Sequence, residues 1–132
     1  MRTLLPLLLA IAVSPAMALT PMPLVGTTWA WYPAAGDGPV PVHDRYTLEL
    51  RPDKSLVVQA DCNRGKGGYR HEDDQLAIGP LAVTKKGCPP PSRGAEFAGR
   101  LSAVDGFRYE GIELVLTSTS GARELRMRPL AR

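Results

Sequence analysis

Glycine and proline occur so often in this chain that only short segments lie between them. The 132 residues include 13 glycines and 13 prolines, and most of the intervening segments alternate apolar and polar residues. Such alternation is typical of strands that bury one face, and frequent turns join these strands into antiparallel sheets. We therefore expect a mainly β fold, a small antiparallel barrel-like sheet of about eight short strands with one short helix.

The clearest hairpin lies at residues 46–60. Residues 46–50 alternate cleanly, residues 51–55 predict a turn, and residues 56–60 predict the returning strand. Proline and glycine make residues 33–41 a loop, and the glycine-rich residues 63–68 predict a second loop. Other strands are expected at residues 28–32, 69–71, 76–78, 81–84, 107–109, 114–116 and 125–128.

The hydrophobic period changes between Ser92 and Val104. Phe97, Leu101 and Val104 are spaced as i, i+4 and i+7, which predicts one apolar face of a short helix. Ser92 is the expected N-cap, and residues 105–106 end the helix. Two glycines inside this segment lower its helix propensity, so the helix must depend on packing.

The first 18 residues have the three parts of a secretory signal peptide. Arg2 supplies the basic start, residues 4–13 are uniformly apolar, and residues 14–18 end in Ala-Met-Ala. The apolar run is too short to span a membrane, which takes about 20 helical residues. We expect cleavage after Ala18, leaving residues 19–132 as a single domain that does not span a membrane. The expected location is the bacterial periplasm or the extracellular medium.

Export decides how the two cysteines are interpreted. Cys62 and Cys88 are too far apart for a Cys-x-x-Cys redox motif, and disulfides persist outside the cytoplasm. A bridge would close a loop of 27 residues and contribute about 3 kcal/mol by the chain-entropy relation. Free thiols and a bridge to another chain remain the alternatives.

The sequence shows no cofactor, metal or catalytic signature. The formal charge of +3 becomes +2 without Arg2, and basic residues are interspersed with acidic ones, unlike the basic face of a nucleic-acid binder. Residues 63–68 lack the Gly-x4-Gly-Lys-Ser/Thr order of residues that forms a phosphate-binding loop. His43 and His71 are the only histidines, too few for a zinc site of three or four ligands. No nucleophile elbow is present.

The residues best placed for recognition form a candidate binding surface. Two tryptophans share one face of the first strand, either as a stacking surface or as core, the latter being the more frequent role. The glycine-rich segment and a basic segment before the prolines add polar and charged groups. The candidate surface therefore consists of Trp29, Trp31, Asn63, Arg64, Lys85 and Lys86.

Taken together, the landmarks resemble the META domain, or HslJ-like, family. They run in order along residues 24–129: Gly26-Thr27-Thr28-Trp29, Ala60-Asp61-Cys62-Asn63, Gly68-Tyr69, Thr84-Lys85-Lys86-Gly87-Cys88, Phe97-Ala98-Gly99-Arg100-Leu101 and Leu114-Val115-Leu116. The resemblance implies a barrel-like β fold with one helix in an envelope or secreted protein. Unlike the family's lipoproteins, this chain has no anchoring cysteine at the cleavage point.

The resemblance also implies a class of function. Family members are linked to heat shock, to novobiocin tolerance and, in parasites, to motility or virulence, and no catalytic residues are established to carry over. We expect a non-enzymatic, monomeric envelope protein that supports stress or antibiotic tolerance by binding a partner or small ligand. The alternative is an inhibitor of a secreted hydrolase, a lysozyme or protease, acting through residues 85–89, because a rigid loop loses little entropy on binding. A hydrolase of envelope sugars has the least support.

Overall fold

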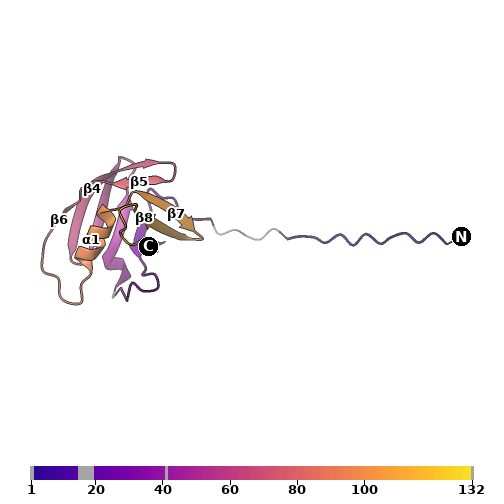
Figure 1. The fold of residues 1–132 in the computed structure, drawn as a ribbon, viewed down its shortest axis with the longest axis horizontal. Helices are drawn as coiled ribbons and strands as arrows, with labels where there is room; N and C mark the ends of the chain where they lie inside the picture. Colours follow the sequence, from indigo (N-terminus) through magenta and orange to yellow (C-terminus); the bar gives the residue numbers. More distant parts are fainter. Residues whose placement is uncertain (1, 15–19, 41, 132) are drawn as a thin grey trace.

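The computed structural model describes residues 2–14, 20–40 and 42–131 of the chain. Within these residues the sheet runs β5-β4-β3-β2-β1-β9-β8-β7, every neighbouring pair is antiparallel, and β6 pairs with β4. The elements are β1 (Thr28–Trp31), η1 (His43–Arg45), β2 (Tyr46–Leu50), β3 (Ser55–Ala60), β4 (Asn63–Glu72), β5 (Gln75–Ile78), β6 (Ala82–Val83), α1 (Gly94–Ser102), β7 (Gly106–Glu110), β8 (Glu113–Thr117) and β9 (Leu125–Pro129). The predicted mainly β class with one short helix is confirmed (Figure 1).

The two outer strands of the eight-strand path, β5 and β7, approach each other and nearly close the sheet into a barrel. The Phe107 N–H donates to the Asp74 carbonyl oxygen at 3.1 Å, and the Ile78 N–H donates to the Val104 carbonyl oxygen at 3.2 Å. These bonds join the ends of β5 to residues at and just before the start of β7. Near-closure reduces the exposed strand edge, where unpaired backbone groups would favour aggregation.

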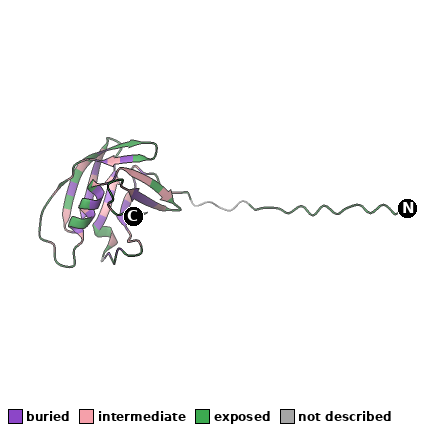
Figure 2. Cartoon of the chain, viewed as in Figure 1, coloured by how far each residue is buried: buried purple, intermediate pink, exposed green. Residues whose placement is uncertain are grey.

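The β2–β3 hairpin forms as predicted, except that β3 begins one residue earlier, at Ser55. Its register runs from Tyr46 opposite Ala60 to Leu50 opposite Leu56, so the apolar residues of both strands face the same side. That side fills the barrel interior, visible as the buried stripes of Figure 2. The large side chains that are less than 2 % exposed are Trp29, Trp31, Tyr46, Phe97, Leu48, Leu50, Leu56, Leu76, Leu101, Leu114, Leu116 and Leu125.

The predicted loop at residues 63–68 is wrong, because this segment is the first half of β4. A Cβ atom at Gly65 would lie 2.9 Å from Val83 Cγ2, and one at Gly67 would lie 2.9 Å from the Pro80 carbonyl oxygen. The glycines are therefore needed where β6 and the residues before it pass close to the strand, not for a turn. Arg64 and Lys66 alternate with them and are both exposed.

Helix α1 buries the face that the sequence predicts. Phe97 and Leu101 are fully buried and Val104, just beyond the helix, is 5 % exposed. The helix is shorter than the segment from residue 92 to residue 104 because the chain leaves helical geometry after Ser102. Its apolar face packs into the barrel core with the strands.

The predicted N-cap is also one residue too early. Arg93 is the N-cap, and its carbonyl oxygen accepts the first helical bond from the Phe97 N–H at 2.9 Å. The Arg93 N–H is held by the Tyr46 hydroxyl at 3.0 Å, a tertiary contact that local sequence rules do not contain. Ser92 Oγ accepts only a 3.4 Å bond from the Gly94 N–H.

The first residue of α1 has no space for a side chain. A Cβ atom at Gly94 would lie 2.6 Å from the Ala60 carbonyl oxygen, whereas one at Gly99 would meet nothing within 4 Å. We expect Gly94→Ala to lower the free energy of unfolding by about 1–3 kcal/mol through overpacking. Gly99→Ala is the control and should raise it by about 1 kcal/mol, the helix propensity difference. Urea denaturation measures both, and equal effects would disprove the close-approach argument.

Residues 2–14 extend away from the barrel without regular secondary structure (Figure 1). Their leucines are largely exposed, with Leu4 at 95 % and Leu8 at 92 %. This apolar segment is therefore not part of the domain core. The expected cleavage site at Ala18 lies outside the described residues. Among those residues, no helix is both long enough and apolar enough to span a bilayer.

Candidate functional site

Cys62 and Cys88 form a disulfide, as expected for an exported chain, with their Cα atoms 5.6 Å apart. Cys62 occupies the two-residue turn between β3 and β4, where Ala60 pairs with Asn63. Asp61 takes the left-handed conformation that this turn requires, with φ of 60°, which aspartate tolerates better than most residues. The bridge joins this turn to the segment that precedes α1.

The Asn63 side chain fastens the same segment a second time. Its amide nitrogen donates to the Lys86 carbonyl oxygen at 3.0 Å, and its amide oxygen accepts the Lys86 N–H at 2.7 Å. The Thr84 hydroxyl donates to the same oxygen at 2.9 Å. The asparagine thus replaces a strand partner for residues 84–86, which accounts physically for an asparagine next to the cysteine.

Backbone pairing completes the attachment. The Thr84 N–H donates to the Arg64 carbonyl oxygen at 3.0 Å, and the Arg64 N–H donates to Thr84 Oγ1 at 3.1 Å. We call residues 84–87 the fastened segment. Both lysine side chains in it, Lys85 and Lys86, are exposed. The segment presents two cations on a backbone held by a disulfide and a set of hydrogen bonds.

A pocket of about 420 Å³ lies between the fastened segment and α1. Most of the lining is aliphatic or glycine, and the two lysines stand at it together with Asn63. The lining residues are Ala60, Asn63, Val83, Thr84, Lys85, Lys86, Gly87, Gly94, Ala95 and Ala98. We call this cavity the α1 pocket. Its size lies within the range of small-molecule sites.

The structure separates the predicted candidate surface into three places. Asn63, Lys85 and Lys86 come together at the α1 pocket. Arg64 lines a different groove of about 640 Å³ on the outer face of β1–β4, where Lys66 is its neighbour. Thr84 lines both cavities, so the basic residues of the two sites are close to one another.

The two tryptophans do not contribute to an exposed surface. Trp29 and Trp31 are both 0 % exposed, so the placement on a binding surface is corrected. Trp29 Nε1 donates to the Leu24 carbonyl oxygen at 3.1 Å, and the Trp31 ring stacks on Phe97 at 5.5 Å between centroids. These large rings bury a large apolar area and therefore contribute strongly to the stability of the core.

Arginines on the β7–β9 part of the sheet are paired with carboxylates. Arg108 binds Glu124 through two bonds of 2.9 and 3.0 Å, and these bonds hold the pKa of Glu124 below its usual range. Arg126 and Arg128 pair with Glu113 at 3.8 and 3.4 Å. The charges of this region largely compensate one another.

The basic side chains around the fastened segment are different. Across the described residues, no ion pair is formed by Arg64, Lys66, Lys85 or Lys86. These four exposed cations lie around two neighbouring cavities and produce a locally positive potential. Glu49 lines the same groove as Arg64 and Lys66, whereas no carboxylate of the described residues lines the α1 pocket beside Lys85 and Lys86.

A comparison with protein families shows to which family the chain is related: the META domain model matches residues 22–129. The chain belongs to the META domain family. Comparison with curated proteins gives no match.

Solved structures share the fold of this META domain. An NMR structure of a protein from Burkholderia xenovorans has 24 % sequence identity and a TM-score of 0.64, over 92 % of this chain and 98 % of that one. A crystal structure of a DUF4847 family protein from Bacteroides vulgatus has 13 % identity and a TM-score of 0.58, over 83 % and 96 % of the two chains. At this level of identity the similarity shows the fold alone.

Sequence reasoning missed the α1 pocket and the basic neighbour Lys66. Ala95 and Ala98 line the pocket, and nothing distinguishes them in the sequence from other small helical residues. Lys66 had a usable signal, because Arg64, Gly65, Lys66 and Gly67 alternate strictly between basic residues and glycine. That alternation is the period of a strand with one face exposed.

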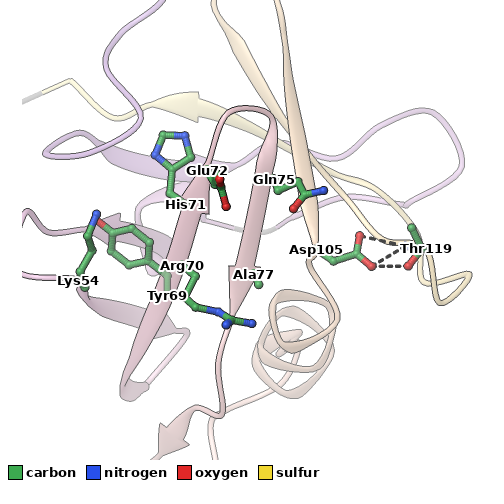
Figure 3. Close-up of a pocket in the computed structure, with 9 residues that line it drawn as sticks. All are labelled: Lys54, Tyr69, Arg70, His71, Glu72, Gln75, Ala77, Asp105 and Thr119. Atoms are coloured by element: carbon green, nitrogen blue, oxygen red, sulfur yellow. Dashed lines mark hydrogen bonds between the residues drawn. The ribbon is translucent and has the colours of Figure 1, made fainter.

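The META domain also has a larger cavity, of about 880 Å³, near the junction of β4, β5 and β7 (Figure 3). Figure 3 shows His71 and Asp105 on opposite sides of this cavity. The His71 ring contacts the Asp73 carbonyl oxygen at 3.0 Å, and Asp105 is bound to Thr119. His71 and Asp105 therefore do not contact each other as an acid–base pair would.

The Asp105–Thr119 contact predicts a pH effect. Hydrogen bonds from the Thr119 hydroxyl and N–H hold the pKa of Asp105 below its usual range. The pKa of Asp105 is therefore higher in the unfolded state than in the folded state. The contact stabilises the folded domain fully at pH values above the unfolded pKa, and this stabilisation is lost as the pH falls through the folded pKa. Thr119→Val should raise the Asp105 pKa, whereas the Ser118→Ala control should not. A carboxyl ¹³C NMR titration measures both, and an unchanged pKa in Thr119→Val contradicts the assignment.

Proposed function

We propose that this META domain is an exported, non-enzymatic binding protein that recognises an acidic protein partner through the fastened segment. The observation that carries the proposal is the double attachment of residues 84–87 by the Cys62–Cys88 disulfide and Asn63. The exposed apolar segment at residues 2–14 supports export, since an apolar patch of that length is not left on a soluble domain without a purpose.

Preorganisation supports binding by this segment. A flexible loop loses conformational entropy when it binds, which costs about 0.5–1.5 kcal/mol for each immobilised side chain with many rotamers. The backbone of this segment is already held at Thr84 by Arg64 and at Lys86 by Asn63. Only the side chains of Lys85 and Lys86 remain to be fixed in a complex.

Exposed positive charge supports an acidic partner. Lys85, Lys86, Arg64 and Lys66 form no ion pair among the described residues. Such a patch accelerates association with a negatively charged surface and makes the affinity dependent on salt.

The test is cross-linking capture from envelope extract with the mature protein as bait, followed by calorimetry with the purified partner. The bait variant Lys85→Gln/Lys86→Gln should lose a stoichiometric partner that wild type retains. The control Arg51→Gln/Arg70→Gln removes the same charge from the opposite end of the β3–β4 pair and should retain it. Equal capture by both variants would reject the fastened segment as the binding element.

The rigid basic segment also favours a second candidate, inhibition of a secreted hydrolase. Lys85 and Lys86 are exposed next to a disulfide and a run of prolines, as a substrate-like but poorly cleaved loop requires. Purified mature protein should then inhibit a lysozyme or a protease at a one-to-one ratio, and Lys85→Gln/Lys86→Gln should release the enzyme. Full activity of a broad panel of both enzyme classes contradicts this alternative.

The proposed binding would account for a role in stress or antibiotic tolerance. A strain lacking the gene should then grow less well during heat or novobiocin exposure. Complementation with wild type should restore growth, whereas complementation with Lys85→Gln/Lys86→Gln should not. Detection of the cleaved protein, residues 19–132, in the periplasm or the medium tests export. An uncleaved protein that stays in the cytoplasm would contradict it.

A further inference from the structure

The α1 pocket has an apolar floor built by three separate elements. Ala60 ends β3, Val83 ends β6, and Ala95 and Ala98 lie on one side of α1. Gly94 brings the helix directly onto Ala60, since a Cβ atom there would lie 2.6 Å from its carbonyl oxygen. The floor is thus made of small side chains on rigid elements, which leaves a volume of about 420 Å³ beside them.

The same pocket is bordered by positive charge on two sides. Lys85 and Lys86 line it from the fastened segment, and the first turn of α1 lines it from the other side. The N-terminal end of a helix carries a partial positive charge, which adds to that of the lysines. The one acidic residue of this turn, Glu96, is engaged by Arg93 at 2.8 Å and by Arg100 at 3.6 Å.

We propose that the α1 pocket binds small amphiphilic anions, with an aliphatic chain over Ala95 and Ala98 and a carboxylate between Lys85 and Lys86. A fully hydrophilic anion should bind weakly, because the burial of aliphatic carbon on the apolar floor supplies most of the binding free energy. The cationic border selects against a positively charged head group. The proposal goes beyond partner recognition, since the pocket floor need not contact a protein bound at the segment.

Octanoate is the probe, measured by calorimetry and by amide shifts in ¹⁵N NMR of the mature protein. We expect saturable binding, with the largest shifts at residues 85–87, 95 and 98. Octylammonium tests the charge of the head group, and acetate tests the need for a chain. Both should bind at least tenfold more weakly than octanoate, and equal binding of either would overturn the proposal.

Two variants separate the floor from the charges. Ala95→Leu/Ala98→Leu fills the pocket without a change in charge and should weaken octanoate binding at least tenfold. Gly99→Leu adds a leucine to the same helix outside the pocket, where a Cβ atom meets nothing within 4 Å, and should leave binding unchanged. Lys85→Gln/Lys86→Gln should weaken binding about 2- to 30-fold, the range for two exposed ion pairs.

Octanoate binding at the α1 pocket and protein binding at the fastened segment can be tested separately. The filled variant should still capture a protein partner, because its fastened segment and lysines are unchanged. Wild-type octanoate affinity in the filled variant, with an unchanged circular dichroism spectrum, would overturn the pocket assignment whatever the partner result. Shifts confined to other surfaces would do the same.

Discussion

Replacing Asp37 by alanine should lower the free energy of unfolding by about 3–5 kcal/mol, the usual cost of removing one member of a buried ion pair. The Asp37 side chain is 1 % exposed, and its carboxylate lies 3.5 Å from Arg100 Nη1 and 3.1 Å from Arg123 Nη2. Its second oxygen accepts the Ala34 N–H at 3.0 Å. Asp37 thereby connects the loop after β1 to α1 and to the residues before β9.

The large effect arises from the charge left behind. Arg100 is 9 % exposed, and without Asp37 its only remaining carboxylate among the described residues is Glu96, which is 44 % exposed. Arg100 also donates to the Glu124 carbonyl oxygen, so a shift of its guanidinium would disturb the start of β9. An unpaired buried cation therefore destabilises the domain far more than the loss of one surface contact.

A double-mutant cycle provides the control. Arg123 is 58 % exposed, so Arg123→Ala should cost less than about 1 kcal/mol. Asp37→Ala combined with Arg100→Met should cost less than the sum of the two single changes, because the second removes the stranded charge. Chemical denaturation monitored by tryptophan fluorescence measures the wild type and all four variants. Strict additivity, or a loss below 1 kcal/mol for Asp37→Ala, would contradict the network.

Removing the disulfide should have the second large effect. Cys62→Ala/Cys88→Ala opens a closed loop of 27 residues, and the chain-entropy relation gives a loss of about 3–4 kcal/mol. For a domain of this size the melting temperature should fall by about 10–15 °C. Far-ultraviolet circular dichroism at 20 °C should remain unchanged, because strand pairing continues on both sides of the bridge.

Amide exchange in the fastened segment separates the contribution of the disulfide from that of Asn63. Asn63 and Thr84 hold residues 84–86 independently of the cysteines, so amide exchange of Lys86 should stay protected in the cysteine variant. Adding Asn63→Ala should remove that protection, while the Thr119→Val change at a distant loop should not. Thiol titration of the unfolded wild type without reductant should find none, and two free thiols would refute the bridge.

Several parts of this META domain follow from local sequence. The hairpin of residues 46–60 was predictable because alternation and a turn signal specify both its strands and its register. The apolar face at Phe97, Leu101 and Val104 was predictable from helical spacing alone. The two cysteines were identifiable as a pair because only two are present and the expected compartment allows a bridge.

Other parts depended on contacts between residues far apart in the chain. The loop predicted at residues 63–68 is a strand because Val83 and Pro80 need the space above Gly65 and Gly67. The N-cap of α1 is Arg93, whose N–H is bound by the Tyr46 hydroxyl, 47 residues away. The candidate site changed most, since both tryptophans lie in the core and Asn63 acts on a backbone more than 20 residues away.

The sequence by itself determined most of the strand pattern, the helix face, the cysteine pair and the family. These properties depend on the period and order of residues along the chain, which folding does not alter. Only the tertiary structure decided that Asp37 meets Arg100 and that β3, β6 and α1 enclose an apolar pocket beside two lysines. Such contacts depend on how the barrel closes, because neighbours in space are fixed by strand order and register, and no local pattern encodes them.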